Sequence, residues 1–135
     1  MNTLTKVGVL IASAMAVSAA NAEVVVIVNA KNPSAALTAE QVANVYLGKD
    51  AGFIPADLPE ASGARDEFYS KIAGKDRAQI KATWARLVFT GKAQPPKEVA
   101  DSAAAVKYVG SNEKAIAYVE KSAIDSSVKA VLAVN

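Results

Sequence analysis

The 135-residue chain contains neither cysteine nor histidine. Without cysteine it can form no disulfide framework and no thiolate metal site. Without histidine it has no Ser-His-Asp triad, and a zinc or copper site would have to be all-carboxylate, which those metals rarely accept. The G-x-S-x-G, P-loop and G-x-G-x-x-G motifs are also missing from the sequence. We therefore expect a protein that is not an enzyme and that holds no metal and no cofactor.

The sequence also lacks a large excess of charge of either sign. Lys and Arg number 15 and Asp and Glu number 13, which gives a formal net charge of +2. A domain that binds nucleic acid or an anionic membrane surface usually has a large excess of basic residues. The small net charge therefore does not indicate either kind of partner. Beyond residue 22, no apolar stretch approaches the roughly 20 residues of a membrane span. We expect no nucleic-acid partner and no membrane insertion after signal cleavage.

The first 22 residues have the pattern of a secretory signal peptide. Lys6 precedes an apolar run at 7–19, and Ala20-Asn21-Ala22 provides a small-residue cleavage site. The run is short for a membrane span, so an uncleaved anchor is the less favoured alternative. The pattern predicts a cleavable signal peptide at 1–22, export to the periplasm, and a single domain at 23–135.

The rest of the chain alternates between strand-like and helix-like segments. Continuous apolar runs at 24–28 and 128–134 predict strands, the first of them covered on both faces, and we expect these two to be central. Shorter strands are predicted at 53–58 and 115–119. Helices are predicted from their capping residues and glycine ends; they begin at Thr38, Ser62, Asp76 and Pro95, and end at Gly48, Gly74, Gly91 and Gly110. This order predicts an α/β domain with a mixed β-sheet flanked by about four helices.

The turn S-G-A-R, residues 62–65, is the strongest candidate for a binding site. A serine at a helix start, followed by glycine, presents a hydroxyl and unpaired backbone N–H groups in one direction, where the helix dipole favours an anion. Arg65 would add a forked donor that matches phosphate or a similar oxyanion. The alternative hypothesis is that Ser62 is only a helix cap and that Arg65 is solvated.

Other polar and aromatic residues favour structural roles. Asp57 and Glu60 lie close enough in sequence to raise the idea of paired catalytic acids, but we expect them to be surface carboxylates in a loop. Trp84 lies at the centre of an apolar helical stripe, which is typical of a core residue rather than of a ligand platform. The lysines in or beside loops are expected to be solvated: Lys31, Lys49, Lys75, Lys92 and Lys97.

Three stretches resemble the phosphate-binding proteins of Pst-type ABC transporters. VVVIVNAKNPSAALTAEQVANVYLGK (24–49) is similar to the strand and helix before their phosphate loop, and EKAIAYVEKSA (113–123) to their GAIGYVE strand. Between them, SGARDEF (62–68) resembles their SGT phosphate turn. The resemblance implies a single lobe of the type II periplasmic-binding-protein fold. It also implies that Ser62, Gly63, Ala64 and Arg65 bind an oxyanion.

The chain departs from that family within the same turn. Leu58 and Glu60 stand where the family has an arginine and an aspartate, and Ala64 replaces its threonine. The resemblance implies a periplasmic substrate-binding protein-like domain for phosphate or a similar oxyanion, which works with an ABC permease. The alternative is an envelope interaction or assembly module that kept the fold without the ligand. Because the family closes two lobes around its anion, we also expect a homo-oligomer or a partner lobe over the open face.

Overall fold

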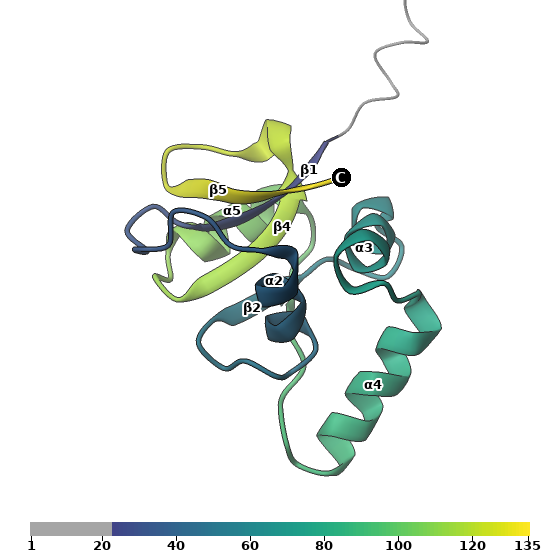
Figure 1. Ribbon diagram of the computed structural model, residues 1–135. Coiled ribbons are helices and arrows are strands. Elements are labelled where there is room, and N and C mark those ends of the chain that lie inside the picture. The colour runs from purple at the N-terminus through teal and green to yellow at the C-terminus, as the bar shows by residue number, and fades with distance from the viewer. Residues whose placement is uncertain (1–22) are drawn as a thin grey trace, which may run out of the picture.

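A five-stranded sheet forms the centre of the structure, a computed structural model that describes residues 23–135 (Figure 1). The predicted signal peptide at 1–22 lies outside the described residues. The strands are β1 (Val24–Asn29), β2 (Ile54–Asp57), β3 (Lys97–Glu98), β4 (Ala115–Glu120) and β5 (Val128–Val134), in the spatial order β3-β2-β4-β1-β5. β1 is antiparallel to β4 and β5, whereas β2 is parallel to β3 and β4, so the sheet is mixed.

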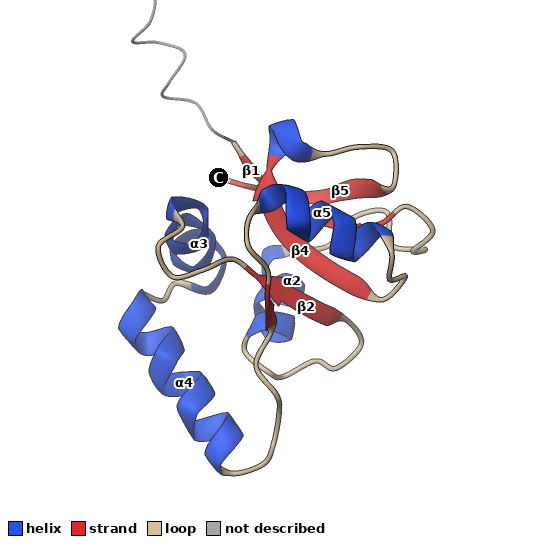
Figure 2. Ribbon diagram, turned by 180° about the vertical axis from the view of Figure 1, so that it is seen from behind, coloured by secondary structure: helices blue, strands red, loops and turns tan. Residues whose placement is uncertain are grey.

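Helices cover both faces of this sheet. They are α2 (Ala39–Tyr46), α3 (Gly63–Phe68), α4 (Arg77–Phe89) and α5 (Ser102–Gly110), with a π-helical turn η2 (Tyr69–Ala73) after α3 and a 3-10 turn η3 (Lys121–Ala123) after β4. The views from the two sides show α5 on one face of the sheet and α2 with α3 on the other (Figures 1 and 2). The predicted α/β class, with a mixed sheet and about four helices, is confirmed.

β1 shows why a continuous apolar run suits this position. Successive side chains of a strand point to opposite faces. Val24, Val26 and Val28 pack with the α2, α3 and α4 side of the core. Val25 and Ile27 pack with α5 on the other side. The prediction of a strand covered on both faces is therefore confirmed for β1.

The expectation that residues 128–134 form a central strand is wrong. β5 lies at the edge of the sheet, and β4 occupies the centre between β2 and β1. An apolar run could not distinguish these positions, because β5 exposes small residues such as Ala130 and Ala133 at little cost. The loop after β1 covers part of the free edge, since Leu37 N donates to Val131 O at 3.1 Å.

The helix predicted to begin at Pro95 begins later. Lys97–Glu98 instead forms β3 beside β2, and Val99 N donates to Asp57 O at 2.9 Å. α5 then begins after Asp101, whose carboxylate accepts from Ala104 N at 2.9 Å as an N-cap. This correction matters for function, because it brings the start of α5 next to the start of α3.

Candidate functional site

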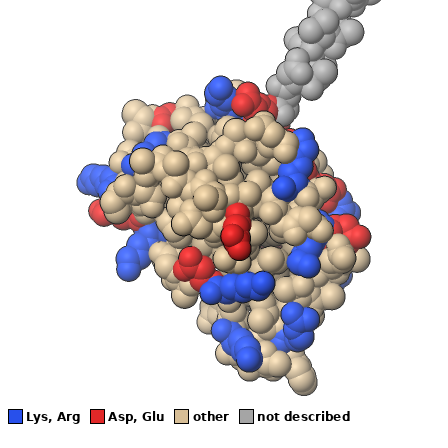
Figure 3. All heavy atoms as spheres, in the orientation of Figure 1, with Lys and Arg blue, Asp and Glu red and all other residues tan. Residues whose placement is uncertain are grey.

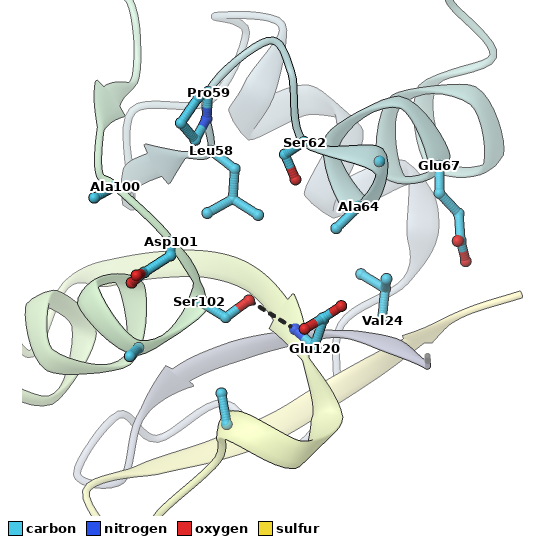
Figure 4. Close-up of a pocket in the computed structure, with 13 residues that line it drawn as sticks. Val24, Leu58, Pro59, Ser62, Ala64, Glu67, Ala100, Asp101, Ser102 and Glu120 are labelled. Atoms are coloured by element: carbon cyan, nitrogen blue, oxygen red, sulfur yellow. Dashed lines mark hydrogen bonds between the residues drawn. The ribbon is translucent and has the colours of Figure 1, made fainter. Parts of the chain in front are cut away.

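The starts of α3 and α5 form one wall each of a pocket with a volume of about 730 Å³ (Figure 4). Ser62, Gly63 and Ala64 line it from the α3 side. Asp101 and Ser102 line it from the α5 side, and the ends of β1 and β4 form its floor. Three of the four residues predicted from the sequence therefore lie together at one pocket. The start of α5 lies opposite them, which the sequence did not predict.

Ser62 occupies the N-cap position of α3, but its hydroxyl makes no capping hydrogen bond. Thr38 and Asp76 differ, because both engage their side chains in capping boxes at the starts of α2 and α4. The Ser62 hydroxyl points into the space between α3 and α5 (Figure 4). It is therefore available to a ligand rather than committed to the helix.

The backbone beside Ser62 is open to the pocket. The first N–H groups of a helix, here those of Gly63 and Ala64, have no acceptor within the helix. A Cβ atom added at Gly63 would meet no heavy atom within 4 Å, so there is free space next to this peptide. Across the pocket, Ser102 Oγ accepts from Glu120 N at 3.1 Å, which leaves the Ser102 proton free to be donated. The pocket thus offers hydroxyl and peptide donors from two helix starts.

Arg65 turns away from this pocket. Its Nη1 atom donates to Leu58 O at 3.0 Å and lies 3.5 Å from Asp57 Oδ2. The guanidinium carbon also lies 5.4 Å from the centre of the Tyr69 ring, and the side chain is only 13% exposed. The structure therefore places Arg65 behind the turn, where it is neither solvated nor part of the pocket lining.

Asp57, which Arg65 faces, is buried at the end of β2. The expectation of a surface loop carboxylate is wrong for this residue, which is only 6% exposed. Tyr69 Oη donates to its Oδ2 at 2.7 Å, Leu58 N donates to its Oδ1 at 3.0 Å, and Tyr118 Oη also donates to Oδ1. Burial raises the pKa of the Asp57 carboxyl above its ordinary value, and the tyrosine hydrogen bonds and the Arg65 charge offset only part of that rise.

The Asp57 cluster, made of Asp57, Arg65, Tyr69 and Tyr118, was missed by sequence reasoning. Burial beside the carboxylate raises the pKa of both tyrosines well above the ordinary range, so both stay protonated donors. Its members come from β2, α3, η2 and β4, and Tyr118 lies 61 residues from Asp57 in the chain. No local motif marks such a cluster. A polar residue ending an otherwise apolar strand was the one available signal.

The charged residues of the pocket lining are acidic. Glu67, Asp101 and Glu120 line it, and no lysine or arginine does so among the described residues. Asp101 already caps α5, and Glu67 pairs with Lys71 at 3.6 Å, so among the described lining residues Glu120 carries the carboxylate that is neither a cap nor part of an ion pair. An anion in this pocket would be bound by neutral donors within a negative rim. A fully deprotonated oxyanion suits such a rim less well than one that keeps a proton to donate.

Residues 23–135 lack two other features. They contain no cluster of three or more side chains arranged to hold a metal ion. They also include no helix with the length and apolar character needed to cross a membrane.

The fold is similar to part of two solved receptors of phosphate transport. One is a phosphate ABC transporter substrate-binding protein from Clostridium perfringens with bound phosphate. The two structures superpose with a TM-score of 0.65 and 24% sequence identity, and the match covers 81% of this chain and 44% of that chain. The other is an ABC-type phosphate transport receptor from Vibrio cholerae. Its match has a TM-score of 0.64 and 20% sequence identity, and covers 81% of this chain and 45% of that chain.

The chain therefore spans less than half the length of either receptor. No protein-family model and no curated protein matches its sequence. The predicted resemblance to phosphate substrate-binding proteins, and the prediction of a single lobe of their fold, are confirmed at the level of the fold.

Proposed function

We propose that the domain binds phosphate or a similar oxyanion in the pocket between α3 and α5. We propose further that it is a periplasmic substrate-binding component of ABC-type transport and not an enzyme. The observation that carries this proposal is the uncommitted Ser62 hydroxyl, which lies at a helix start in the wall of a pocket. The likeness in fold to two phosphate receptors supports it.

In this proposal the anion is held by neutral donors. The N–H groups of Gly63 and Ala64 and the Ser62 hydroxyl bind it from α3, and the Ser102 hydroxyl binds it from α5. The helical run from α3 continues into η2, so the peptide dipoles behind the turn extend as far as Ala73. The proposal thus keeps Ser62, Gly63 and Ala64 as the residues that bind the oxyanion.

Arg65 contributes to the same site as a positioning residue. It joins the carbonyl of Leu58, just before the turn, to the first turn of α3. Its charge also lies beside Asp57 at the end of β2. Both contacts fix the distance between β2 and α3, and that distance places Ser62 at the pocket wall.

The acidic rim favours a protonated oxyanion. Hydrogen phosphate can donate its proton to the carboxylate of Glu120, whereas sulfate carries no proton at neutral pH and is repelled by that carboxylate. We therefore expect the domain to bind phosphate more tightly than sulfate.

The proposal is tested by calorimetric titration of the protein with phosphate and with sulfate. Ser62→Ala should weaken phosphate binding by about 10- to 150-fold, which corresponds to the loss of about 1.5–3 kcal/mol for a hydrogen bond to a charged group. Gly63→Ala should also weaken binding, because its methyl group enters the free space beside the turn, while the melting temperature stays unchanged.

Ser126→Ala is the matched control, since this exposed serine lies outside the pocket lining. Its affinity should equal that of the unmodified protein. A protein that shows no heat and no NMR shift near Ser62 at millimolar phosphate or sulfate would sink the binding function. That outcome would favour the interaction module instead.

A further inference from the structure

The C-terminal end of α4 projects from the body of the domain and is apolar on its outer side. In Figure 1 this helix runs away from the sheet towards the lower end of the molecule. Phe89 is 91% exposed and Val88 is 51% exposed. Ala78, Ala82 and Ala85 are exposed as well, and their i, i+4, i+7 spacing continues to Phe89 at i+11 along one face.

The other side of α4 is apolar too, since Ile80 and Trp84 pack into the core. A helix with apolar residues on opposite sides is typical of one that is covered on both. Residues 23–135 cover only the inner side. The outer side, with Phe89 at its end, is therefore available to a further surface.

Positive side chains lie along α4 and beside it. They are Lys49, Lys75, Lys81, Arg86 and Lys92, and all but the half-buried Lys75 are exposed. Within residues 23–135, none of the five forms an ion pair. Residues 77–92 contain no aspartate and no glutamate. Figure 3 shows lysine and arginine side chains gathering at the lower end of the molecule, with acidic side chains along the upper margin of this group.

Three of these cations lie around one hollow beside α4. Lys49, Lys75 and Arg86 line it together with Thr83, and its volume is about 230 Å³. They come from three separate places in the chain: the turn after α2, the turn after η2, and α4 itself. None of the described residues that line the hollow is acidic, so it offers three positive charges and a hydroxyl to one anionic group.

We propose that this face, the α4 tip with its surrounding cations, docks on the surface of an anionic phospholipid bilayer. The hollow receives a headgroup phosphate, and Phe89 and Val88 enter the boundary between headgroups and acyl chains. Membrane-surface sites characteristically combine exposed aromatic and aliphatic side chains with a polybasic surround. The net charge of +2 conceals this site, because acidic residues collect elsewhere, as at the pocket between α3 and α5.

The shape and charge of the face favour a bilayer over other occupants. A second copy of this chain would bring the same cations against one another, which is repulsive. Phe89 is the last residue of α4, whose C-terminal end projects in Figure 1, and its exposed side chain can enter a soft surface without a matching cavity. The pocket lies near the ends of β1 and β4, far from this tip in Figure 1, so docking leaves it open to solution.

The experiment measures co-sedimentation of residues 23–135 with vesicles of pure phosphatidylcholine and with vesicles containing about 30% phosphatidylglycerol. We expect binding to the anionic vesicles alone, and weaker binding at higher salt. The triple variant Lys49→Gln, Lys75→Gln, Arg86→Gln should bind about a hundredfold more weakly, since each cation near an anionic surface contributes roughly a fivefold factor. Phe89→Ser should weaken binding about tenfold without changing the melting temperature, because the ring is 91% exposed.

The matched control is the triple variant Lys31→Gln, Lys107→Gln, Lys114→Gln, which removes the same charge from exposed positions away from α4. It should keep vesicle binding within about threefold of the unmodified protein. Equal losses in the two triple variants would overturn the proposal, because the effect would then follow net charge alone. An unchanged affinity in Phe89→Ser would overturn it as well. The proposal would also be overturned if the protein did not bind anionic vesicles, even if its α4 face bound an acidic protein instead.

Discussion

Removing the Arg65 side chain tests whether its contacts with Leu58 and Asp57 stabilise the turn at residues 62–65. In Arg65→Ala, the carbonyl of Leu58 loses a charged donor at 3.0 Å, and the buried carboxylate of Asp57 loses its cation at 3.5 Å. Removing one partner of a buried ion pair costs about 3–5 kcal/mol. Here the carboxylate keeps three hydrogen bonds, from Tyr69, Tyr118 and Leu58 N, which reduces the cost. We expect the free energy of unfolding to fall by about 2–4 kcal/mol.

The loss should depend on pH in a defined direction. Burial raises the pKa of the Asp57 carboxyl, so the folded protein holds this proton more tightly than the unfolded chain does. Stability therefore decreases as pH rises from the unfolded pKa through the folded pKa. Without Arg65 the folded pKa rises further, because the cation was one of the causes lowering it. The destabilisation by Arg65→Ala should then be larger at pH of about 8 than at about 5.

Urea denaturation of purified protein at these two pH values measures the effect. Arg77→Ala is the control, because Arg77 makes an exposed ion pair with Asp66 at 2.8 Å and should contribute little. In the background of Asp57→Asn, which carries no buried charge, Arg65→Ala should cost only about 1 kcal/mol. An Arg65→Ala variant as stable as Arg77→Ala at both pH values would refute the role of this pair.

Two further predictions concern the core and the processing of the chain. Trp84→Ala should lower the free energy of unfolding by about 3–5 kcal/mol in denaturant melts, because the ring is 9% exposed and its Nε1 donates to Tyr46 O at 3.0 Å; a loss below about 1 kcal/mol would return Trp84 to the ligand-platform hypothesis. Mass spectrometry of material from the periplasm should find a mature N-terminus at Glu23, and a mass that retains Met1 would contradict cleavage.

Local signals explain which parts of the site could be predicted. A serine followed by glycine before an amphipathic segment predicts a helix start, so Ser62, Gly63 and Ala64 were found from sequence. The same signal could not show that the Ser62 hydroxyl is left free, since that depends on the geometry of one turn. Nor could it orient Arg65, because the partner that holds its guanidinium is a carboxylate eight residues earlier on another element.

The sequence by itself determined the α/β class, the buried strand β1 and the capped starts of α2 and α4, because hydrophobic periodicity and capping act over a few residues. Tertiary structure decided which strand is central, which carboxylate is buried and which charges gather. β5 is an edge strand, Asp57 meets Tyr118 across 61 residues, and Lys49, Lys75 and Arg86 share one hollow. Pairing, burial and charge clustering depend on contacts between distant segments, which composition and local pattern do not contain.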